Sequence, residues 1–246
     1  MKDLVLLHSL LTDRSAYDGV KPALGRDFRV HIPDLPGYGA CESRGEESIE
    51  AYADRVAPMV PQGAAVLGNG FGGFVAVALA LRHRAKVAAL IAAPALAAFP
   101  PPAREPFRVM AAKVREGGMA TVLDAAINRM FPPAYVAAHP EVVAERKRAL
   151  AQADPQAFAR ACLALSQLNF GEALGAITCP TLVMAGELDQ TTPAVLARDL
   201  AARIPGARFR QLGGCGHCPQ IEDAQRLVEV VLAFGADLAE DVAAAR

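Results

Sequence analysis

Apolar residues follow two patterns along the chain, short continuous runs and longer stretches with helical spacing. Short apolar runs without polar alternation are typical of strands that are buried on both faces of a parallel sheet. Apolar residues that recur every three or four positions predict helices with one buried face. The runs predict strands at 3–8, 28–33, 64–67, 86–94, 181–186 and 207–212. The spacing predicts helices at 48–60, 71–83, 193–203 and from Pro219 to about Leu238, followed by an Ala-rich tail that frays.

The alternation of strands and helices stops after the fourth predicted strand. The segment ALAAFPPPAREP is too rich in proline to continue a helix or a central strand, because proline lacks an N–H and clashes with the preceding turn. Beyond it, the spacing predicts helices at 106–116, 119–130, 140–152 and 155–168. We therefore expect a core domain formed by 1–97 and 174–246, and a helical cap, 98–173, inserted after the fourth strand.

The alternating pattern predicts an α/β protein with a doubly wound, mainly parallel sheet. Ligands of such sheets bind outside the carboxyl ends of the strands. A cap inserted after the fourth strand would cover that edge as a lid. The loops expected there are 8–13, 34–40, 68–72, 94–100, 186–192 and 213–219.

Composition and charge narrow the classes of partner. The 246 residues carry a net charge of −1, and no cluster of basic residues suggests a nucleic-acid partner. No apolar run reaches the roughly 20 residues that a membrane-spanning helix needs. Five irregularly spaced cysteines suggest free thiols in a reducing compartment, which predicts a cytoplasmic protein. We expect a small-molecule substrate as the partner, with a homodimer as a further possibility.

The candidate chemistry lies in three of the expected loops. A strand, a tight glycine-rich turn and a helix surround Gly68-Asn69-Gly70-Phe71-Gly72, which is the context of the nucleophile elbow G-x-S-x-G. Glycine occupies position 70, where that motif has its serine. The two other loops carry Asp189 and His217, each directly after a predicted strand. The order elbow, acid, histidine is the order of an acyl-transfer triad in one large class of α/β enzymes.

Four motifs in this order resemble the α/β-hydrolase family, in particular its small bacterial esterases, enol-lactonases and C–C bond hydrolases. The resemblance covers nearly the whole chain and rests on LLHSLLTD, DLPGYGACES, GELDQTTP and GCGHCPQIE, together with the elbow. The chain departs from the family in three ways. Ser9 replaces the glycine of the HG motif, Gly70 replaces the catalytic serine, and the usual N-terminal hairpin is missing before His8.

The resemblance implies a role for each site residue. His217 would be the general base, and Asp189 would hold its tautomer and stabilise the imidazolium. The backbone N–H of Phe71, at a helix N-terminus, suits a developing oxyanion, and the N–H of Leu10 would be the second donor. Gly70 marks the position of the nucleophile but supplies no hydroxyl.

Other residues near the expected site carry weaker predictions. We expect Ser9, Asn69, Met130 and Phe131 to contact a mainly apolar substrate, while Ser9 also suits a cap on the following turn. Arg104, Arg108 and Arg129 are candidates for binding an anionic group. Glu222, in the first turn of a helix, needs no catalytic role. We interpret all five cysteines as packing residues: Cys41, Cys162, Cys179, Cys215 and Cys218.

No cofactor or metal is predicted. No G-x-G-x-x-G motif follows the first predicted strand. The cysteines beside His217 lack the second ligand pair of a zinc site.

Three interpretations of Gly70 stay open at this point. The chain is a variant of a serine hydrolase for small, mainly apolar esters or lactones, inactivated by a serine-to-glycine change. Alternatively it is a serine-free enzyme whose His217–Asp189 dyad activates water or transfers a proton, as in a lyase or isomerase. In the third interpretation the chain is a non-catalytic protein that binds a small ligand.

Overall fold

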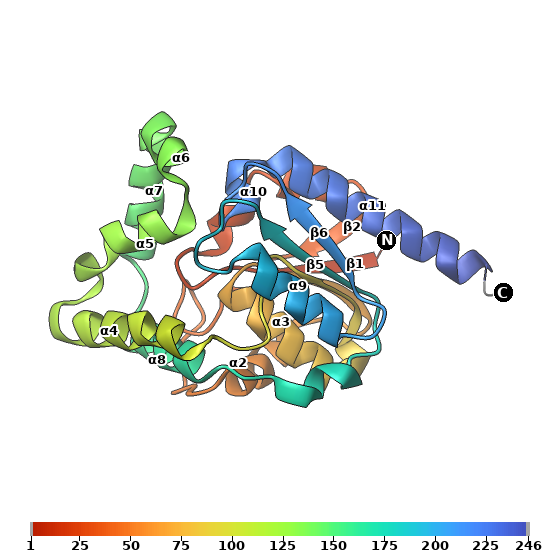
Figure 1. Ribbon diagram of the computed structural model, residues 1–246, viewed down its shortest axis with the longest axis horizontal. Helices are drawn as coiled ribbons and strands as arrows, with labels where there is room; N and C mark the ends of the chain where they lie inside the picture. Colours follow the sequence, from red (N-terminus) through yellow and green to blue (C-terminus); the bar gives the residue numbers. More distant parts are fainter. Residues whose placement is uncertain (1, 245–246) are drawn as a thin grey trace.

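The computed structural model describes residues 2–244, and the side chains of this range up to residue 240. Its strands form one sheet in the order β2-β1-β3-β4-β5-β6, and every neighbouring pair is parallel. The predicted doubly wound parallel sheet is therefore confirmed (Figure 1). The strands are β1 Lys2–Leu7, β2 Phe28–His31, β3 Ala64–Gly68, β4 Val87–Ala92, β5 Thr181–Gly186 and β6 Arg208–Leu212.

Helices cover both faces of the sheet. In the core these are α1 Lys21–Leu24, α2 Ile49–Val56, α3 Phe71–Arg82, α9 Ala194–Arg203, α10 Pro219–Glu222 and α11 Ala224–Ala244. Between β4 and β5 lie α4 Pro101–Gly117, α5 Leu123–Met130, α6 Pro133–Ala138, α7 Pro140–Leu150 and α8 Pro155–Gln167. The short 3-10 helices are η1 Arg14–Tyr17, η2 Ala57–Met59, η3 Arg84–Lys86, η4 Met119–Thr121 and η5 Gly171–Ala176.

Strand β1 shows why the apolar runs carry no polar alternation. Val5 and Leu7 belong to the core on the side of α2 and α3, whereas Leu4 and Leu6 belong to the core on the side of α11. All four side chains are fully buried. Both faces of the central strands therefore need apolar side chains, which removes the two-residue period of a half-exposed strand.

The sheet topology places the site at one point on its edge. The chain passes from β1 outward to β2 and then returns to β3 on the other side of β1. The loops that leave β1 and β3 diverge to opposite sides there, which opens a crevice at the carboxyl ends of the two strands. Residues 8–12 and 69–70 follow these two strands. Helices α4 to α7 project beyond the same edge, away from both termini (Figure 1).

The structure corrects several predicted helix boundaries. Helix α4 begins at Pro101, not near 106, because Pro101 and Pro102 lie in the first turn, where no N–H group has an acceptor within the helix; Pro106 lies inside the helix. Helix α6 was not predicted. The helix expected from Pro219 to Leu238 is divided at Asp223, and α11 continues to Ala244 where fraying was expected.

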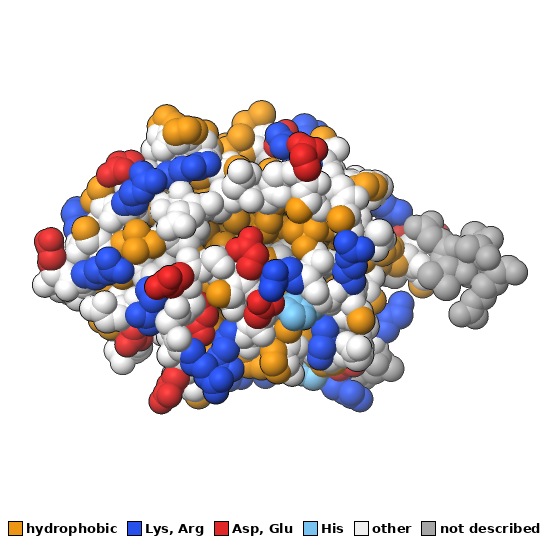
Figure 2. Space-filling view, turned by 90° about the horizontal axis from the view of Figure 1, so that it is seen from below, with side chains coloured by type: hydrophobic (Ala, Val, Ile, Leu, Met, Phe, Trp, Pro, Cys, Tyr) orange, Lys and Arg blue, Asp and Glu red, His pale blue; other side chains and the backbone are white. Residues whose placement is uncertain are grey.

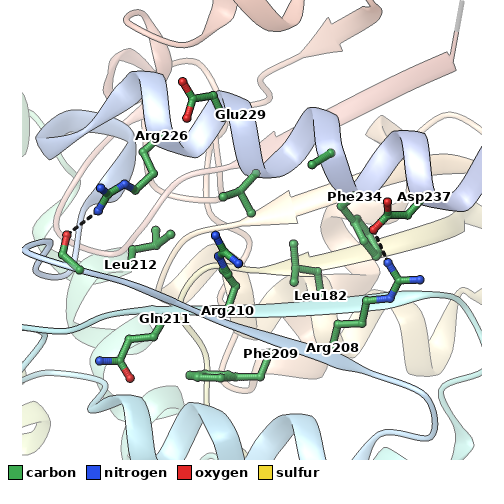
Figure 3. A pocket seen from close by; sticks show the side chains of 13 residues that line it. Leu182, Arg208, Phe209, Arg210, Gln211, Leu212, Arg226, Glu229, Phe234 and Asp237 are labelled. Carbon is green, nitrogen blue, oxygen red and sulfur yellow. Dashed lines mark hydrogen bonds and ion pairs between the residues drawn. The ribbon is translucent and has the colours of Figure 1, made fainter.

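Exposed charges protect the edge strand β6. Arg208 and Arg210 on β6 are exposed and line a hollow of about 810 Å³ between this strand and α11 (Figure 3). Arg208 pairs with Asp237 of α11 across this hollow. Charged side chains on an edge strand discourage pairing with another chain. On the face shown in Figure 2, acidic and basic side chains are mixed rather than gathered by sign.

Candidate functional site

Glycines shape the turn between β3 and α3. Gly70 has φ +53° and ψ −115°, a region that side chains rarely adopt, and it caps the N-terminus of α3. Gly72 packs directly on β1, because a Cβ there would stand 2.2 Å from the Leu7 carbonyl oxygen. This close contact places the start of α3 against the residues that follow β1.

His217 and Asp189 form a buried dyad. The Nδ1 of His217 lies 2.9 Å from Oδ2 of Asp189. The second carboxylate oxygen of Asp189 accepts the backbone N–H groups of Thr191 at 2.8 Å and Thr192 at 2.9 Å. Burial acts to raise the pKa of Asp189, but the His217 charge and these hydrogen bonds outweigh it, so its pKa is lowered. The ionised carboxylate fixes Nδ1 as the protonated nitrogen and leaves Nε2 as a base.

The free nitrogen of the dyad faces Gly70. A Cβ on residue 70 would stand 2.7 Å from Nε2 of His217 and 2.6 Å from Oγ of Ser9. Both distances are shorter than nonbonded contacts allow, so the imidazole and the Ser9 hydroxyl border the space of a residue 70 side chain. A side chain at position 70 therefore requires both groups to shift.

Glu222 holds the His217 loop. Its two carboxylate oxygens accept the backbone N–H groups of Gly216 at 2.7 Å and Cys218 at 2.8 Å, one on each side of the histidine. Burial raises its pKa, against the effect of these hydrogen bonds. The N–H of His217 itself donates to the Met130 carbonyl at 3.1 Å. Glu222 thus has a positioning role that its place in a helical first turn does not indicate.

Asn69 connects the elbow to the same loop. Its amide NH₂ donates to the carbonyls of Ala93 at 2.6 Å and His217 at 2.8 Å, and its oxygen accepts the Gln220 side chain at 3.0 Å. Asn69 is fully buried. Its polar atoms are therefore occupied by the protein, and the expected contact with substrate is not supported.

The loop after β1 is held by a neutral histidine. Nδ1 of His8 donates to the Ser9 carbonyl at 2.9 Å, while Nε2 accepts the N–H of Leu35 at 3.1 Å. Burial lowers the pKa of His8, which favours this neutral form. The loop carries Leu10, whose carbonyl accepts the Tyr38 hydroxyl. Thr12, rather than Ser9, caps the turn, since its hydroxyl accepts the Ser9 N–H at 3.1 Å.

A narrow cavity lies where these loops meet. Its free space, about 20 Å³, has room for about one water molecule. Phe71 is the first residue of α3, so its N–H has no acceptor within the helix and lies at the positive end of the helix dipole. The lining consists of Ser9, Leu10, Leu11, Gly70, Phe71, Phe74, Phe99, Phe107, Met110, Arg129, Leu165, Thr191, Thr192 and His217.

Two cap residues expected at the substrate lie outside this lining. Met130 is fully buried and supplies its carbonyl to the His217 N–H. Phe131 is buried and stacks on Tyr135, with ring centroids 5.0 Å apart. Met130 therefore joins the His217 loop to the helices that follow β4, and neither Met130 nor Phe131 belongs to the cavity lining.

Among the three candidate arginines, Arg129 lines the cavity. Its guanidinium lies over the Phe107 ring, 5.4 Å from the centroid, and burial lowers its pKa. Arg104 donates to the Phe99 carbonyl, and Arg108 pairs with Glu105 on the surface. An anionic group in the cavity would therefore meet Arg129.

The cysteines show no sign of thiolate chemistry. Burial raises the pKa of Cys41, raises that of Cys215 to about 11, and holds that of Cys218 well above its usual range. A protonated thiol is a poor nucleophile and a poor metal ligand. Within the described residues, no cluster of three His, Cys, Asp or Glu side chains is placed to hold a metal ion.

Among the helices of the described residues, none has the length and apolar character of a membrane-spanning segment.

The comparison with known families agrees with the geometry. The profile of the family described as "Alpha/beta hydrolase family" matches residues 4–230, most of the chain. The chain belongs to the alpha/beta hydrolase family. Among curated members, it is 32% identical to the pimeloyl-[acyl-carrier protein] methyl ester esterase of Aromatoleum aromaticum, over 94% of this chain and 98% of that protein. The Aeromonas hydrophila protein of the same name is 31% identical, over 94% of each chain.

Solved structures of hydrolases share the fold closely. The enol-lactonase from Burkholderia xenovorans superposes with a TM-score of 0.88 at 29% identity, covering 96% of this chain and 91% of that one. A thermophilic esterase from Thermogutta terrifontis gives a TM-score of 0.86 at 27% identity, covering 96% and 90%. The hydrolase resemblance seen in the motifs is therefore confirmed at the level of family and fold.

Proposed function

We propose that this hydrolase cleaves a small, mainly apolar carboxylic ester or lactone. The observation that carries the proposal is the His217–Asp189 dyad, whose Nε2 faces the cavity beside the N-terminus of α3. A base and a helix N-terminus at one cavity can remove a proton from a nucleophile and stabilise the resulting oxyanion. The names of the relatives, methyl ester esterases and an enol-lactonase, support ester and lactone substrates.

The proposed reaction assigns a role to the dyad, to two backbone N–H groups and to the cap. His217 takes the proton from the attacking hydroxyl group and returns it to the leaving alcohol, while Asp189 orients the imidazole. The N–H groups of Phe71 and Leu10 receive the oxyanion. Residues 98–173 act as the cap, and apolar side chains such as Phe107 surround the acyl group. Proton transfer without hydrolysis and ligand binding without chemistry are the alternatives, and the following test separates hydrolysis from both.

The test compares hydrolysis of p-nitrophenyl acetate, p-nitrophenyl butyrate and an enol-lactone by the parent, His217→Ala and Asp189→Asn. We expect the parent to turn over at least one of these substrates. Loss of the base should lower kcat by about 10²–10⁴-fold, and Asp189→Asn should lower it because the wrong tautomer forms. His139→Ala, which removes a half-exposed histidine of the cap, is the matched control and should leave kcat unchanged.

Two results would contradict the proposal. Hydrolysis that survives His217→Ala would place the chemistry elsewhere. A parent that binds these esters, seen by calorimetry, but does not hydrolyse them would support the ligand-binding alternative.

A further inference from the structure

We propose that Ser9 supplies the nucleophile in this chain, in place of the serine that the elbow lacks. The inference rests on the proposed ester hydrolysis and names the attacking group. It starts from the juxtaposition of the Ser9 hydroxyl, the His217 imidazole and the empty side-chain position of Gly70 in one cavity.

Distances place the hydroxyl beside the base. Oγ of Ser9 lies 2.6 Å, and Nε2 of His217 lies 2.7 Å, from the same point, the position of a Cβ on Gly70. The two atoms are therefore separated by at most about twice that distance. Both residues line the cavity with Phe71. A hydroxyl there can approach the imidazole and a bound carbonyl carbon together.

The Ser9 hydroxyl is free while its backbone is fixed. The Ser9 N–H donates to the Thr12 hydroxyl, and the Ser9 carbonyl accepts Nδ1 of His8 and the Thr12 N–H. Among the described residues, none forms a hydrogen bond with the Ser9 hydroxyl, although Ser9 is only 2% exposed. Buried hydroxyls are normally hydrogen-bonded. An unpartnered hydroxyl that faces a cavity is therefore available to a reacting group.

A side chain at position 70 would overlap the present position of the Ser9 hydroxyl. Because a Cβ on residue 70 would stand 2.6 Å from Oγ of Ser9, the two side chains cannot both keep these positions. The family pattern has glycine at the first position and serine at the second, whereas this chain has the reverse. In the family pattern the hydroxyl belongs to the turn after β3. In this chain it belongs to the turn after β1 and borders the same base.

The proposed reaction uses the Ser9 hydroxyl, the His217 imidazole, the ester and water. The Ser9 Oγ–H gives its proton to Nε2 of His217 as Oγ bonds to the ester carbonyl carbon. The bond from that carbon to the alcohol oxygen then breaks, and the leaving alcohol takes the proton from His217. A water molecule then gives a proton to His217 and attacks the acyl carbon. The bond from that carbon to Oγ breaks, the carboxylic acid leaves, and His217 returns the proton to Oγ of Ser9. Charge on the carbonyl oxygen develops near the N-terminus of α3 in both halves.

Covalent labelling tests the assignment without depending on the substrate. The parent, Ser9→Ala and His217→Ala are treated with a fluorophosphonate, and the adduct is located by intact-mass measurement and peptide mapping. We expect one adduct, on Ser9, that is absent from Ser9→Ala and forms at least about 100-fold more slowly in His217→Ala. Ser166→Ala removes a buried serine whose hydroxyl donates to the Leu163 carbonyl, outside the cavity, and should label like the parent.

Kinetics and an exchange of residues give two further readouts. The parent should release p-nitrophenol in an initial burst equal to the enzyme concentration, and Ser9→Ala should lose the burst and at least about 100-fold in kcat. The double change Ser9→Gly with Gly70→Ser relieves the contact at Oγ and should move the fluorophosphonate adduct to position 70. Gly70→Ser alone should crowd the site and label less than the double variant.

The outcomes separate the two proposals. Parent-level hydrolysis in Ser9→Ala, lost in His217→Ala, would overturn Ser9 as nucleophile and leave ester hydrolysis with water as the attacking group. An adduct mapped to any residue other than Ser9 would also overturn it. An adduct on Ser9 without turnover of any ester or lactone would uphold the activated hydroxyl and overturn the substrate class.

Discussion

Asn69 shows how one side chain holds two loops of the site together. Its NH₂ group donates to two backbone carbonyls, one after β4 and one at His217. A carboxylate in its place would turn both donors into acceptors that face carbonyl oxygens. Asn69→Asp should therefore lower the free energy of unfolding by about 3 kcal/mol, measured by chemical denaturation, and displace His217.

The matched control is the same substitution at an asparagine that acts only as an acceptor. The side-chain oxygen of Asn169 accepts the Gly171 N–H in an exposed turn. A carboxylate keeps that role, so Asn169→Asp should change the free energy of unfolding little. Equal effects of the two substitutions would show that the Asn69 NH₂ group does not hold the His217 loop.

At the residue scale, motifs in the sequence mark the two residues of the dyad. His217 and Asp189 follow strands in glycine-rich loops, and the structure brings them into contact. Most partners of Asn69 and Glu222 are backbone atoms, either of loops distant in sequence or of the turn around His217. No side-chain pattern records such partners. Their positioning roles therefore required coordinates.

At the scale of the elements, helices α4 and α5 supply Phe107, Met110 and Arg129 to the cavity lining, and under the proposed function they would limit the room for an acyl group. Phe107 of α4 is buried, lines the cavity and packs between the Phe99 ring and Arg129. Because the free space has room for about one water molecule, a substrate must displace these side chains. Phe107→Leu should raise the kcat/KM ratio of p-nitrophenyl butyrate to acetate by about 10-fold, the effect of added apolar volume in a pocket.

Phe158→Leu is the control for a general loosening of these helices. Phe158 of α8 is fully buried and does not line the cavity. Its substitution should lower the free energy of unfolding by about 1–2 kcal/mol, as at Phe107, without changing the ratio. An equal change of the ratio in both variants would mean that Phe107 does not set the acyl length.

The predicted elements differ from the structure at their ends for identifiable reasons. Strand positions agree within a few residues. In the central strands this follows from side chains that are buried on both faces, as in β1. The start of α4 was missed because three consecutive prolines suggest a break, although prolines suit a helical first turn. Helix α6 is six residues long and has no buried residue, so no apolar spacing marks it.

At the scale of the whole molecule, the strand order explains why separate loops converge. The switch between β1 and β3 brings Ser9 and Gly70 to one crevice, and β5 and β6 deliver Asp189 and His217 to the same edge. The alternation of strands and helices predicted this edge. The alternation did not predict that the Ser9 hydroxyl would lie near His217, because their proximity depends on distances between the loops that follow β1 and β6.

The buried His8 gives the fold a dependence on pH. Burial holds its pKa below the value of about 6.5 that it has in the unfolded chain. Below about pH 6.5 the unfolded chain therefore binds a proton that the folded protein does not. The free energy of unfolding should fall as the pH falls, by up to about 1.4 kcal/mol per pH unit, until the lower pKa of the folded state is reached.

The carboxyl groups of Asp189 and Glu222 also make the free energy of unfolding depend on pH. The lowered pKa of Asp189 contributes stability that is present above about pH 3.8 and is lost as the pH falls through its folded pKa. The raised pKa of Glu222 acts in the opposite sense, since the folded state holds that proton more tightly from about pH 4.5 upward. A comparison of variants at each pH removes both contributions from the His8 measurement.

His8→Gln keeps a donor and an acceptor but cannot take up a proton. Chemical denaturation of the parent and this variant at pH 7.5, 6.5 and 5.5 should show a shallower decline for the variant, even if it is less stable at pH 7.5. His139→Gln, at a half-exposed site, should retain the slope of the parent. An unchanged slope in His8→Gln would mean that another group takes up the proton on unfolding. The neutral histidine that fixes the Ser9 backbone would then not be the group that makes stability depend on pH.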